Sequence, residues 1–277
     1  MQLLHSRGAL SLDQPVVMGV LNVTPDSFAD GGRFLDPGLA LEHGLRLVDE
    51  GAQIIDVGGE STRPGAAPVE AEEQLRRVLP VVRALAARTT ALISVDTSSP
   101  EVIEQVVDAG AGLINDVRAL QEPGALAAVV RARSATCLMH MRGQPATMQR
   151  QAEYLDVMAE VRSMLRERVA ACVAAGVDAD RLCIDPGFGF GKQPTHNREL
   201  LHRLAELAEL GRPILVGLSR KSWLAHLTGR AVGDRLAGSL ALAVVAVMHG
   251  ARIIRAHDVA ATLDALKVAH TLSASTT

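Results

Sequence analysis

Eight short apolar segments, each closing on a polar or charged residue, constrain the fold of this chain more than any other feature. The first occupies residues 16–22 and leads into a polar, glycine-containing stretch that ends at Gly32. An apolar run bounded by turn residues is typical of a strand buried on both faces that feeds a loop. The pattern predicts strands at residues 16–22, 54–57, 92–97, 113–117, 136–140, 182–187, 214–221 and 253–258.

Helical patterns separate these segments, and alternating strands and helices predict a parallel sheet. Asn22 and His257, at the ends of the first and last strands, are 235 positions apart. That is about 34 residues for each of seven repeats, and eight such units close a barrel. We therefore predict a single (β/α)₈ TIM barrel domain over residues 1–277. A doubly wound open sheet is the alternative, but no Gly-x-Gly-x-x-Gly motif opens a helix after the first strand.

The amino-acid composition limits the classes of function that are compatible with this chain. Hydrophobic residues make up 48% of the chain and aromatic residues only 2%, which suits a barrel core of Val, Leu, Ile and Ala. A net charge of -3 gives no basic footprint for nucleic acid. No signal peptide is evident, and the longest apolar stretch, residues 236–248, is too short to span a bilayer. The scattered Cys137, Cys172 and Cys183 indicate free thiols, so we expect a cytoplasmic protein that does not bind membranes.

Polar side chains gather at the predicted carboxyl ends of the strands, where such barrels bind ligands. A lone Asp at a strand end often serves as a helix cap or a structural ion pair, so Asp56 is interpreted as structural. By the same reasoning His140 is interpreted as a packed histidine, and Cys137 and Cys183 as core. The recurrence at six or more strand ends nevertheless indicates a binding site. Its members are Asn22, Asp96, Asn115, Asp185, Lys221, Arg255 and His257, with Arg63 and Arg220 as further cations suited to an anion.

The motifs at these ends resemble those of the dihydropteroate synthase family, in the family's order and over nearly the whole chain. They read MGVLNVTPDSFADGG, DVGGESTRPGA, SVDTSSPEV, INDVRAL, CLMHMRG, DPGFGFGK, GLSRKSWL and IIRAHDV. The resemblance implies an enzyme that joins 6-hydroxymethyl-7,8-dihydropterin diphosphate to 4-aminobenzoate and releases pyrophosphate. It also implies that the enzyme is a homodimer that uses Mg²⁺.

The resemblance assigns roles to individual residues. It implies a pterin pocket formed by Asp96, Asn115, Asp185 and Lys221, with Met139 and Phe190 as apolar walls. The diphosphate would lie against Asn22, Thr62, Arg63, Arg255 and His257, with Asn22 also contacting Mg²⁺. The 4-aminobenzoate would lie near the helix start at Ser222, beside Lys221, Arg220, Arg63, Pro64, Phe28 and Phe190.

The aniline nitrogen is itself the nucleophile, so catalysis is expected from positioning and from stabilising the departing pyrophosphate. The family reaction is SN1-like, and Asp30 matches a position suited to stabilising the pterin cation. The residues expected to act in catalysis are Asp30, Arg63, Lys221, Arg255 and His257. The glycine-rich loops at residues 24–32 and 188–194 are predicted to be lids that order over bound substrate.

Three other hypotheses about the function stay open. One is a catalytically silent paralogue that binds pterin or phosphate without turnover. Another is a pterin-dependent methyltransferase on the same barrel, although that activity would not need the Ser-Arg-Lys-Ser and Arg-x-His segments. A non-enzymatic scaffold would leave the charge at the strand ends unexplained.

Overall fold

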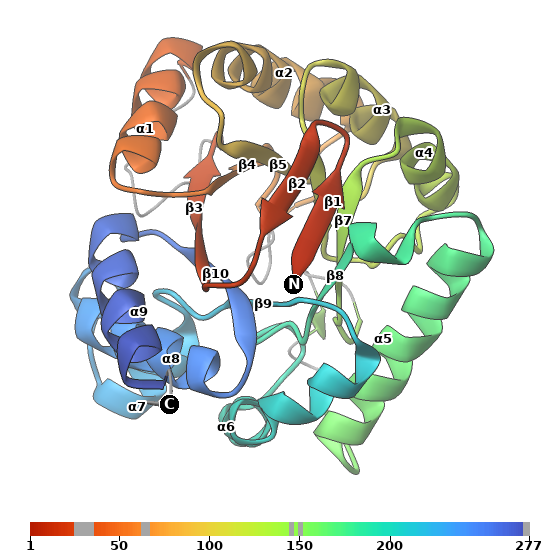
Figure 1. The fold of residues 1–277 in the computed structure, drawn as a ribbon. Helices are drawn as coiled ribbons and strands as arrows, with labels where there is room; N and C mark the ends of the chain where they lie inside the picture. Colours follow the sequence, from red (N-terminus) through yellow and green to blue (C-terminus); the bar gives the residue numbers. More distant parts are fainter. Residues whose placement is uncertain (25–35, 62–66, 144–146, 149–151, 274–277) are drawn as a thin grey trace.

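The chain folds into a closed barrel of eight parallel strands ringed by helices (Figure 1). The computed structural model describes residues 1–24, 36–61, 67–143, 147–148 and 152–273. Around the barrel the strands follow the order β10-β3-β4-β5-β6-β7-β8-β9. They are β3 (Val16–Asn22), β4 (Ile54–Gly58), β5 (Leu92–Asp96), β6 (Leu113–Asp116), β7 (Ala135–Met139), β8 (Leu182–Asp185), β9 (Ile214–Gly217) and β10 (Ala251–Ala256). The closed order confirms the predicted (β/α)₈ barrel and excludes the open sheet.

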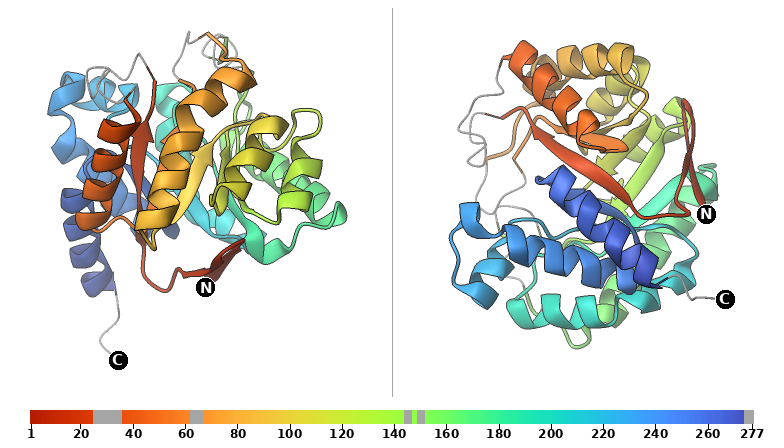
Figure 2. Two further views of the ribbon diagram at one scale, coloured as in Figure 1. Left: turned by 90° about the horizontal axis from the view of Figure 1, so that it is seen from above. Right: turned by 60° about the vertical axis from the view of Figure 1, so that its left-hand side comes forward.

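The helices form the outer ring, as the two views in Figure 2 also show. They are α1 (Pro37–Asp49), α2 (Ala71–Arg88), α3 (Pro100–Asp108), α4 (Ala125–Ala132), α5 (Val157–Ala174), α6 (Pro194–His202), α7 (Ser222–Thr228), α8 (Leu236–Met248) and α9 (Val259–Ser273). Short 3₁₀ turns lie at η3 (Ala179–Arg181), η4 (Leu204–Leu210) and η5 (Val232–Asp234). Asp36 and Asp156 cap α1 and α5 by accepting backbone N–H groups of the first turn. No helix in the described part of the chain has the length and apolar character needed to cross a membrane.

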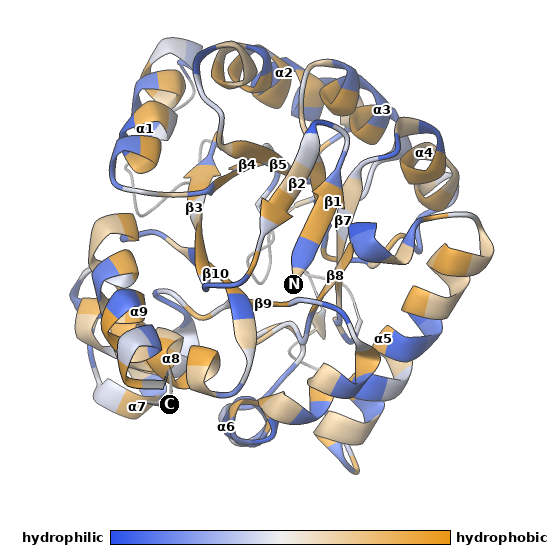
Figure 3. Ribbon diagram, viewed as in Figure 1, coloured by the Kyte–Doolittle hydropathy of each residue, from blue (hydrophilic) through white to orange (hydrophobic). Residues whose placement is uncertain are grey.

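Alternation along the strands builds two apolar layers. Met18, Ile54 and Leu215 belong to a cluster inside the barrel, whereas their neighbours Val17 and Ile55 belong to the cluster between strands and helices. Successive side chains of a strand point to opposite faces, so one apolar run supplies both layers. Figure 3 shows the result as apolar strands inside a ring of helices that are polar on their outer faces. Cys137 and Cys183 lie in the inner cluster, which confirms that they are core.

An N-terminal hairpin that the sequence analysis did not predict covers the amino end of the barrel (Figure 1). It consists of β1 (Gln2–His5) and β2 (Gly8–Ser11). Leu3 is fully buried and joins the inner cluster. Arg7 donates to the carbonyls of Ala86 and Gly110, each at 3.3 Å, where α2 and α3 end. The hairpin therefore closes the end of the barrel opposite the predicted site.

Several strands end earlier than the sequence predicts, and this changes where site residues lie. β8 ends at Asp185, because Gly187 has a left-handed φ of 69° that turns the chain into a loop. β9 ends at Gly217, four residues before Lys221. Lys221 therefore lies immediately before α7 rather than on a strand, which corrects the prediction of a strand over residues 214–221.

Candidate active site

Asp56, at the carboxyl end of β4, is the centre of a buried polar group. Its side chain is fully buried and accepts hydrogen bonds from Ser94 Oγ at 2.6 Å, Asn115 Nδ2 at 3.1 Å and Arg255 Nε at 2.7 Å. The interpretation of Asp56 as a structural ion pair is therefore confirmed. Two of its partners, Asn115 and Arg255, are predicted site residues, so Asp56 fixes the orientation of both.

Asp96 lies beside this group and is also buried. Its Oδ2 is 3.6 Å from Nη2 of Arg255. Burial, together with the negative charge of Asp56, raises the pKa of Asp96 to about 7 against the opposing effect of Arg255. Near neutral pH this carboxyl group therefore changes between a form that donates and one that only accepts hydrogen bonds.

Asp185 and Lys221 form the other side of the same space. Asp185 Oδ1 accepts from the backbone N–H of Gly187 at 2.7 Å, and its register partner on β7 is Met139, a predicted apolar wall. Burial lowers the pKa of Lys221 to about 8, and the charge of Asp185 acts against that shift. The Lys221 ammonium donates to the Phe188 carbonyl and lies 4.3 Å from the ring centroid of Phe190. The four residues predicted for the pterin pocket thus converge at one end of the barrel.

Arg220 and His257 have partners that the sequence analysis did not identify. The Arg220 guanidinium makes a two-point ion pair with Asp258, at 3.0 and 2.5 Å. Its backbone has a φ of 58° and its N–H donates to Ser239 Oγ at 3.0 Å. Nδ1 of His257 lies 3.1 Å from Ser219 Oγ. The positive charge of Arg220 is therefore satisfied within the protein, and its structural effect is to shape the turn before Lys221.

The loop after β8 is held by several contacts. Tyr154 donates its hydroxyl to the Gly191 carbonyl at 2.9 Å, and Asn197 Oδ1 accepts the N–H of Gly189 at 2.8 Å. Phe188 is buried with its ring parallel to Trp223, the centroids 6.3 Å apart. These contacts are at odds with the prediction that residues 188–194 form a flexible lid, because closing and opening would have to break them.

Five predicted site residues lie outside the described residues, as does all of the predicted lid at residues 24–32 except residue 24. They are Phe28, Asp30, Thr62, Arg63 and Pro64. Their assignments stay predictions.

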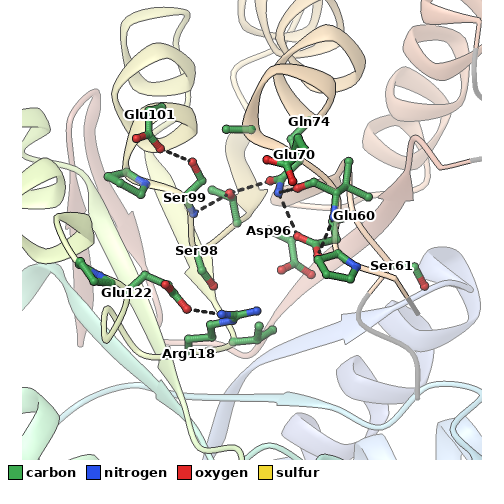
Figure 4. Close-up of a pocket in the computed structure, with 17 residues that line it drawn as sticks. Glu60, Ser61, Glu70, Gln74, Asp96, Ser98, Ser99, Glu101, Arg118 and Glu122 are labelled. Carbon is green, nitrogen blue, oxygen red and sulfur yellow. Dashed lines mark hydrogen bonds and ion pairs between the residues drawn. The ribbon is translucent and has the colours of Figure 1, made fainter. Parts of the chain in front are cut away.

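A groove of about 370 Å³ opens beside Asp96, between the carboxyl ends of β4–β6 and the first turns of α2 and α3 (Figure 4). On one wall Glu60 accepts from Gln74 Nε2 at 3.0 Å, and burial raises the pKa of Glu60. On the other wall Arg118 pairs with Glu122. The groove is thus lined mainly by acidic and polar groups, and Asp96 joins it to the buried polar group.

The Mg²⁺ contact predicted at this end of the barrel is Asn22. Among the described residues, no three His, Cys, Asp or Glu side chains are grouped to bind a metal. Asn22 ends β3, half-buried, and a Cβ on Gly58 would come within 3.3 Å of its Oδ1. The amide oxygen is a donor of the kind that Mg²⁺ accepts beside phosphate and water.

The comparisons with known proteins agree with this geometry. The family model described as pterin binding enzyme matches residues 18–257. Dihydropteroate synthase of Escherichia coli K12 is 52% identical over 275 residues, which cover 99% of this chain and 98% of the relative. The chain belongs to the dihydropteroate synthase family.

Solved dihydropteroate synthase structures extend the match to three dimensions. The Yersinia pestis enzyme in complex with a sulfonamide drug has a TM-score of 0.97 and 48% identity, covering 99% of this chain and 100% of that one. The Xanthomonas albilineans enzyme with 4-aminobenzoic acid has a TM-score of 0.90 and 53% identity, covering 96% of each chain.

Dihydropteroate synthase motifs also contain the residues that the sequence analysis passed over. Ser94, Ser219 and Lys192 lie within or next to segments quoted for the resemblance, and each now has a contact with a polar group of the site or of its loop. The signal that could have found them is position, because each lies within two residues of a predicted site residue (Asp96, Arg220 and Phe190, respectively, for Ser94, Ser219 and Lys192).

Proposed function

We propose that this chain condenses 6-hydroxymethyl-7,8-dihydropterin diphosphate with 4-aminobenzoate to give 7,8-dihydropteroate and pyrophosphate. The observation that carries the proposal is the convergence of Asp96, Asn115 and Asp185 with Lys221 and Arg255 at one end of the barrel. Family membership supports the same reaction.

The pterin edge presents both donors and acceptors, and the site residues complement them. Asn115 gives its amide N–H to Asp56, which leaves its oxygen for a pterin donor. The Asp185 carboxylate accepts from pterin N–H groups, and Lys221 donates to a ring acceptor. Buried polar groups of this kind reject a ring that leaves them unpaired.

The diphosphate binds at the end of β10 in this proposal. Arg255 directs Nε to Asp56 and Nη2 towards Asp96, so its remaining N–H groups pair with phosphate oxygens beside His257. Thr62 and Arg63 complete the anion site. Asn22 would hold Mg²⁺, which neutralises phosphate charge when bound.

The C–O bond to the diphosphate breaks ahead of attack by the aniline nitrogen, as in an SN1-like displacement. Asp30 stabilises the resulting pterin cation, and Arg255, His257, Arg63 and Lys221 stabilise the leaving group and hold the reactants. The 4-aminobenzoate lies beside Ser222, Phe190, Pro64 and Phe28. Arg220 contributes by shaping the turn before Lys221, since its charge is paired with Asp258.

The protein acts as a cytoplasmic homodimer in this proposal. Exposed apolar side chains gather on α7 and α8, where Leu227 is 53% and Met248 is 66% exposed. Leu236 and Val245 on α8 extend the same apolar character. Light scattering after size-exclusion chromatography tests this, and a monomer at micromolar concentration would contradict it. The three free, buried cysteines agree with a reducing compartment.

A pyrophosphate-release assay tests the reaction. Dihydropterin diphosphate is supplied with Mg²⁺, with and without 4-aminobenzoate. We expect release that depends on 4-aminobenzoate, together with formation of 7,8-dihydropteroate. Binding of the pterin diphosphate without release would instead identify a catalytically silent paralogue.

A further inference from the structure

Lysine is rare in this chain, which has three lysines and 25 arginines. Lys267 is on α9 with its side chain 66% exposed. The other two, Lys192 and Lys221, lie at the carboxyl end of the barrel, and Lys192 is only 2% exposed. Lys221 is a predicted pterin contact, but no role has yet been assigned to Lys192.

The Lys192 ammonium lies among neutral acceptors. Its Nζ is 3.0 Å from the Gly187 carbonyl, 3.1 Å from the Phe190 carbonyl and 3.3 Å from the His140 carbonyl. It is also 2.9 Å from Nδ1 of His140. Three oxygens that only accept call for three donors, which the ammonium has and a neutral amine lacks. A planar guanidinium could not bring its separated N–H groups to one point in this way.

The Lys192 contacts involve the same two residues, Gly187 and His140, whose backbone N–H groups donate to Asp185. The N–H of Gly187 donates to Asp185 Oδ1 at 2.7 Å, and the N–H of His140 donates to the Asp185 carbonyl at 2.9 Å. A Cβ on Gly187 would fall 1.9 Å from the His140 carbonyl oxygen, so the loop and the end of β7 are in close contact. Lys192 ties together the two segments that determine where the Asp185 carboxylate points.

The charges around Asp185 add an electrostatic effect. Burial raises the pKa of Asp185, and Lys221, Lys192 and Arg255 oppose that shift. Burial lowers the pKa of Lys192 well below its usual value, and Lys221 adds to that shift, whereas Asp185 and the three carbonyl oxygens around Nζ favour the charged ammonium.

His140 faces Lys192 and stays neutral. Burial holds the pKa of His140 well below its usual value, and the charges of Lys192 and Arg142 lower it further. Tyr154, whose ring is 6.1 Å from that of His140, has its pKa raised to about 12 by burial and is neutral too. His140 and Tyr154 therefore add no charge of their own on the loop side of Asp185, where Lys192 lies.

We propose that Lys192 is a positioning residue for pterin recognition, which keeps Asp185 ionised and fixes the turn over residues 187–190. The inference rests on the proposed function, because it assumes that Asp185 accepts from the pterin ring. Lys192 does not touch the substrate in this arrangement and acts through Asp185.

Lys192→Met and Lys192→Gln test the proposal, with Lys267→Met as the matched control at an exposed lysine. The Gln side chain keeps N–H donors for the loop carbonyls without the charge, so it is used where the Met variant does not fold. For each folded variant, kcat/KM for dihydropterin diphosphate is measured from pH 5 to pH 9. Asp96 titrates in the same range, so profiles are compared only between proteins that differ at one lysine.

We expect kcat/KM for the pterin diphosphate at pH 7 to fall at least about tenfold in both Lys192 variants, with a much smaller change in KM for 4-aminobenzoate. The acidic limb of the profile should move up by about one pH unit, as expected when one nearby opposite charge is removed. Lys267→Met should match the wild type. A folded Lys192→Gln variant with the wild-type acidic limb would overturn the proposal. Failure of the wild type to bind the pterin diphosphate would overturn the proposed function and this inference with it.

Discussion

Asp56→Asn is the substitution that most directly tests how the site is held together. The wild-type carboxylate accepts from Ser94, Asn115 and Arg255 in full burial. Asn115 and Arg255 both donate to Oδ2 and Ser94 donates to Oδ1, so an Asn oxygen at the Oδ2 position keeps two contacts and its N–H₂ faces the Ser94 hydroxyl, which can accept. Removing one partner of a buried ion pair costs about 3–5 kcal/mol. Because the Asn oxygen keeps two of the three contacts and the loss is that of the negative charge facing Arg255, we expect about 3 kcal/mol of lost stability, at the low end of that range.

Urea denaturation measures the loss, with Asp258→Asn as the control. The Arg220–Asp258 pair has both side chains 24% exposed, and we expect its loss to cost about 1 kcal/mol. Calorimetry on the folded Asp56→Asn protein should also show weaker binding of dihydropterin diphosphate, because Arg255 loses the negative charge that holds its guanidinium in place. Equal stability losses in the two variants, with unchanged pterin affinity, would refute the role given to Asp56.

Three further predictions concern the ligands. Arg255→Ala should weaken binding of pterin diphosphate far more than that of 4-aminobenzoate, and calorimetry showing unchanged diphosphate affinity would place the anion site elsewhere. The folded-state pKa of Asp96, raised to about 7, exceeds its unfolded value of about 3.9, so the folded protein holds a proton that the unfolded chain has released between these values. Asp96 should therefore contribute stability that is lost as the pH rises from about 4 to 7, so the free energy of unfolding of Asp96→Asn should lack this contribution; parallel pH profiles of the two proteins would contradict the assignment. Pyrophosphate with Mg²⁺ should strengthen binding of a sulfonamide, Phe28→Ala should abolish the gain, and equal affinity with and without pyrophosphate would rule out ordered assembly.

The barrel fold was predictable because each barrel strand is a short apolar run that can be recognised by itself in the sequence. Runs such as residues 92–96 are buried throughout, so their apolar character is visible without any knowledge of the neighbours. The N-terminal hairpin was missed because its strands are four residues each and β2 is largely exposed. Such short, half-exposed strands leave little periodicity to detect.

The members of the site were predictable from topology, but their pairing was not. A barrel brings all strand ends to one side, so polar residues there become neighbours. Asp56 and Arg255 are 199 positions apart in the sequence. They meet because β10 pairs with β3 and β3 pairs with β4, and only the closed structure gives that register. The pairing of Arg220 with Asp258 was not predictable for the same reason, since the two residues are 38 positions apart.

Charge balance at the barrel mouth limits how the diphosphate can be bound. In the part of the mouth that the structure describes, Asp56, Asp96 and Asp185 face Arg255, Lys221 and Lys192. Three carboxylates against three cations leave little surplus positive charge, which suits an uncharged pterin ring. A diphosphate adds several negative charges. Arg220 cannot offset them because its own positive charge is already paired with Asp258. In the proposed binding mode the compensation comes from His257, from Arg63 and from a cation bound at Asn22. Chelating divalent cations should accordingly weaken binding of pterin diphosphate strongly while leaving binding of the free 6-hydroxymethyl pterin nearly unchanged, and equal losses for the two ligands in calorimetry would show that this balance is wrong.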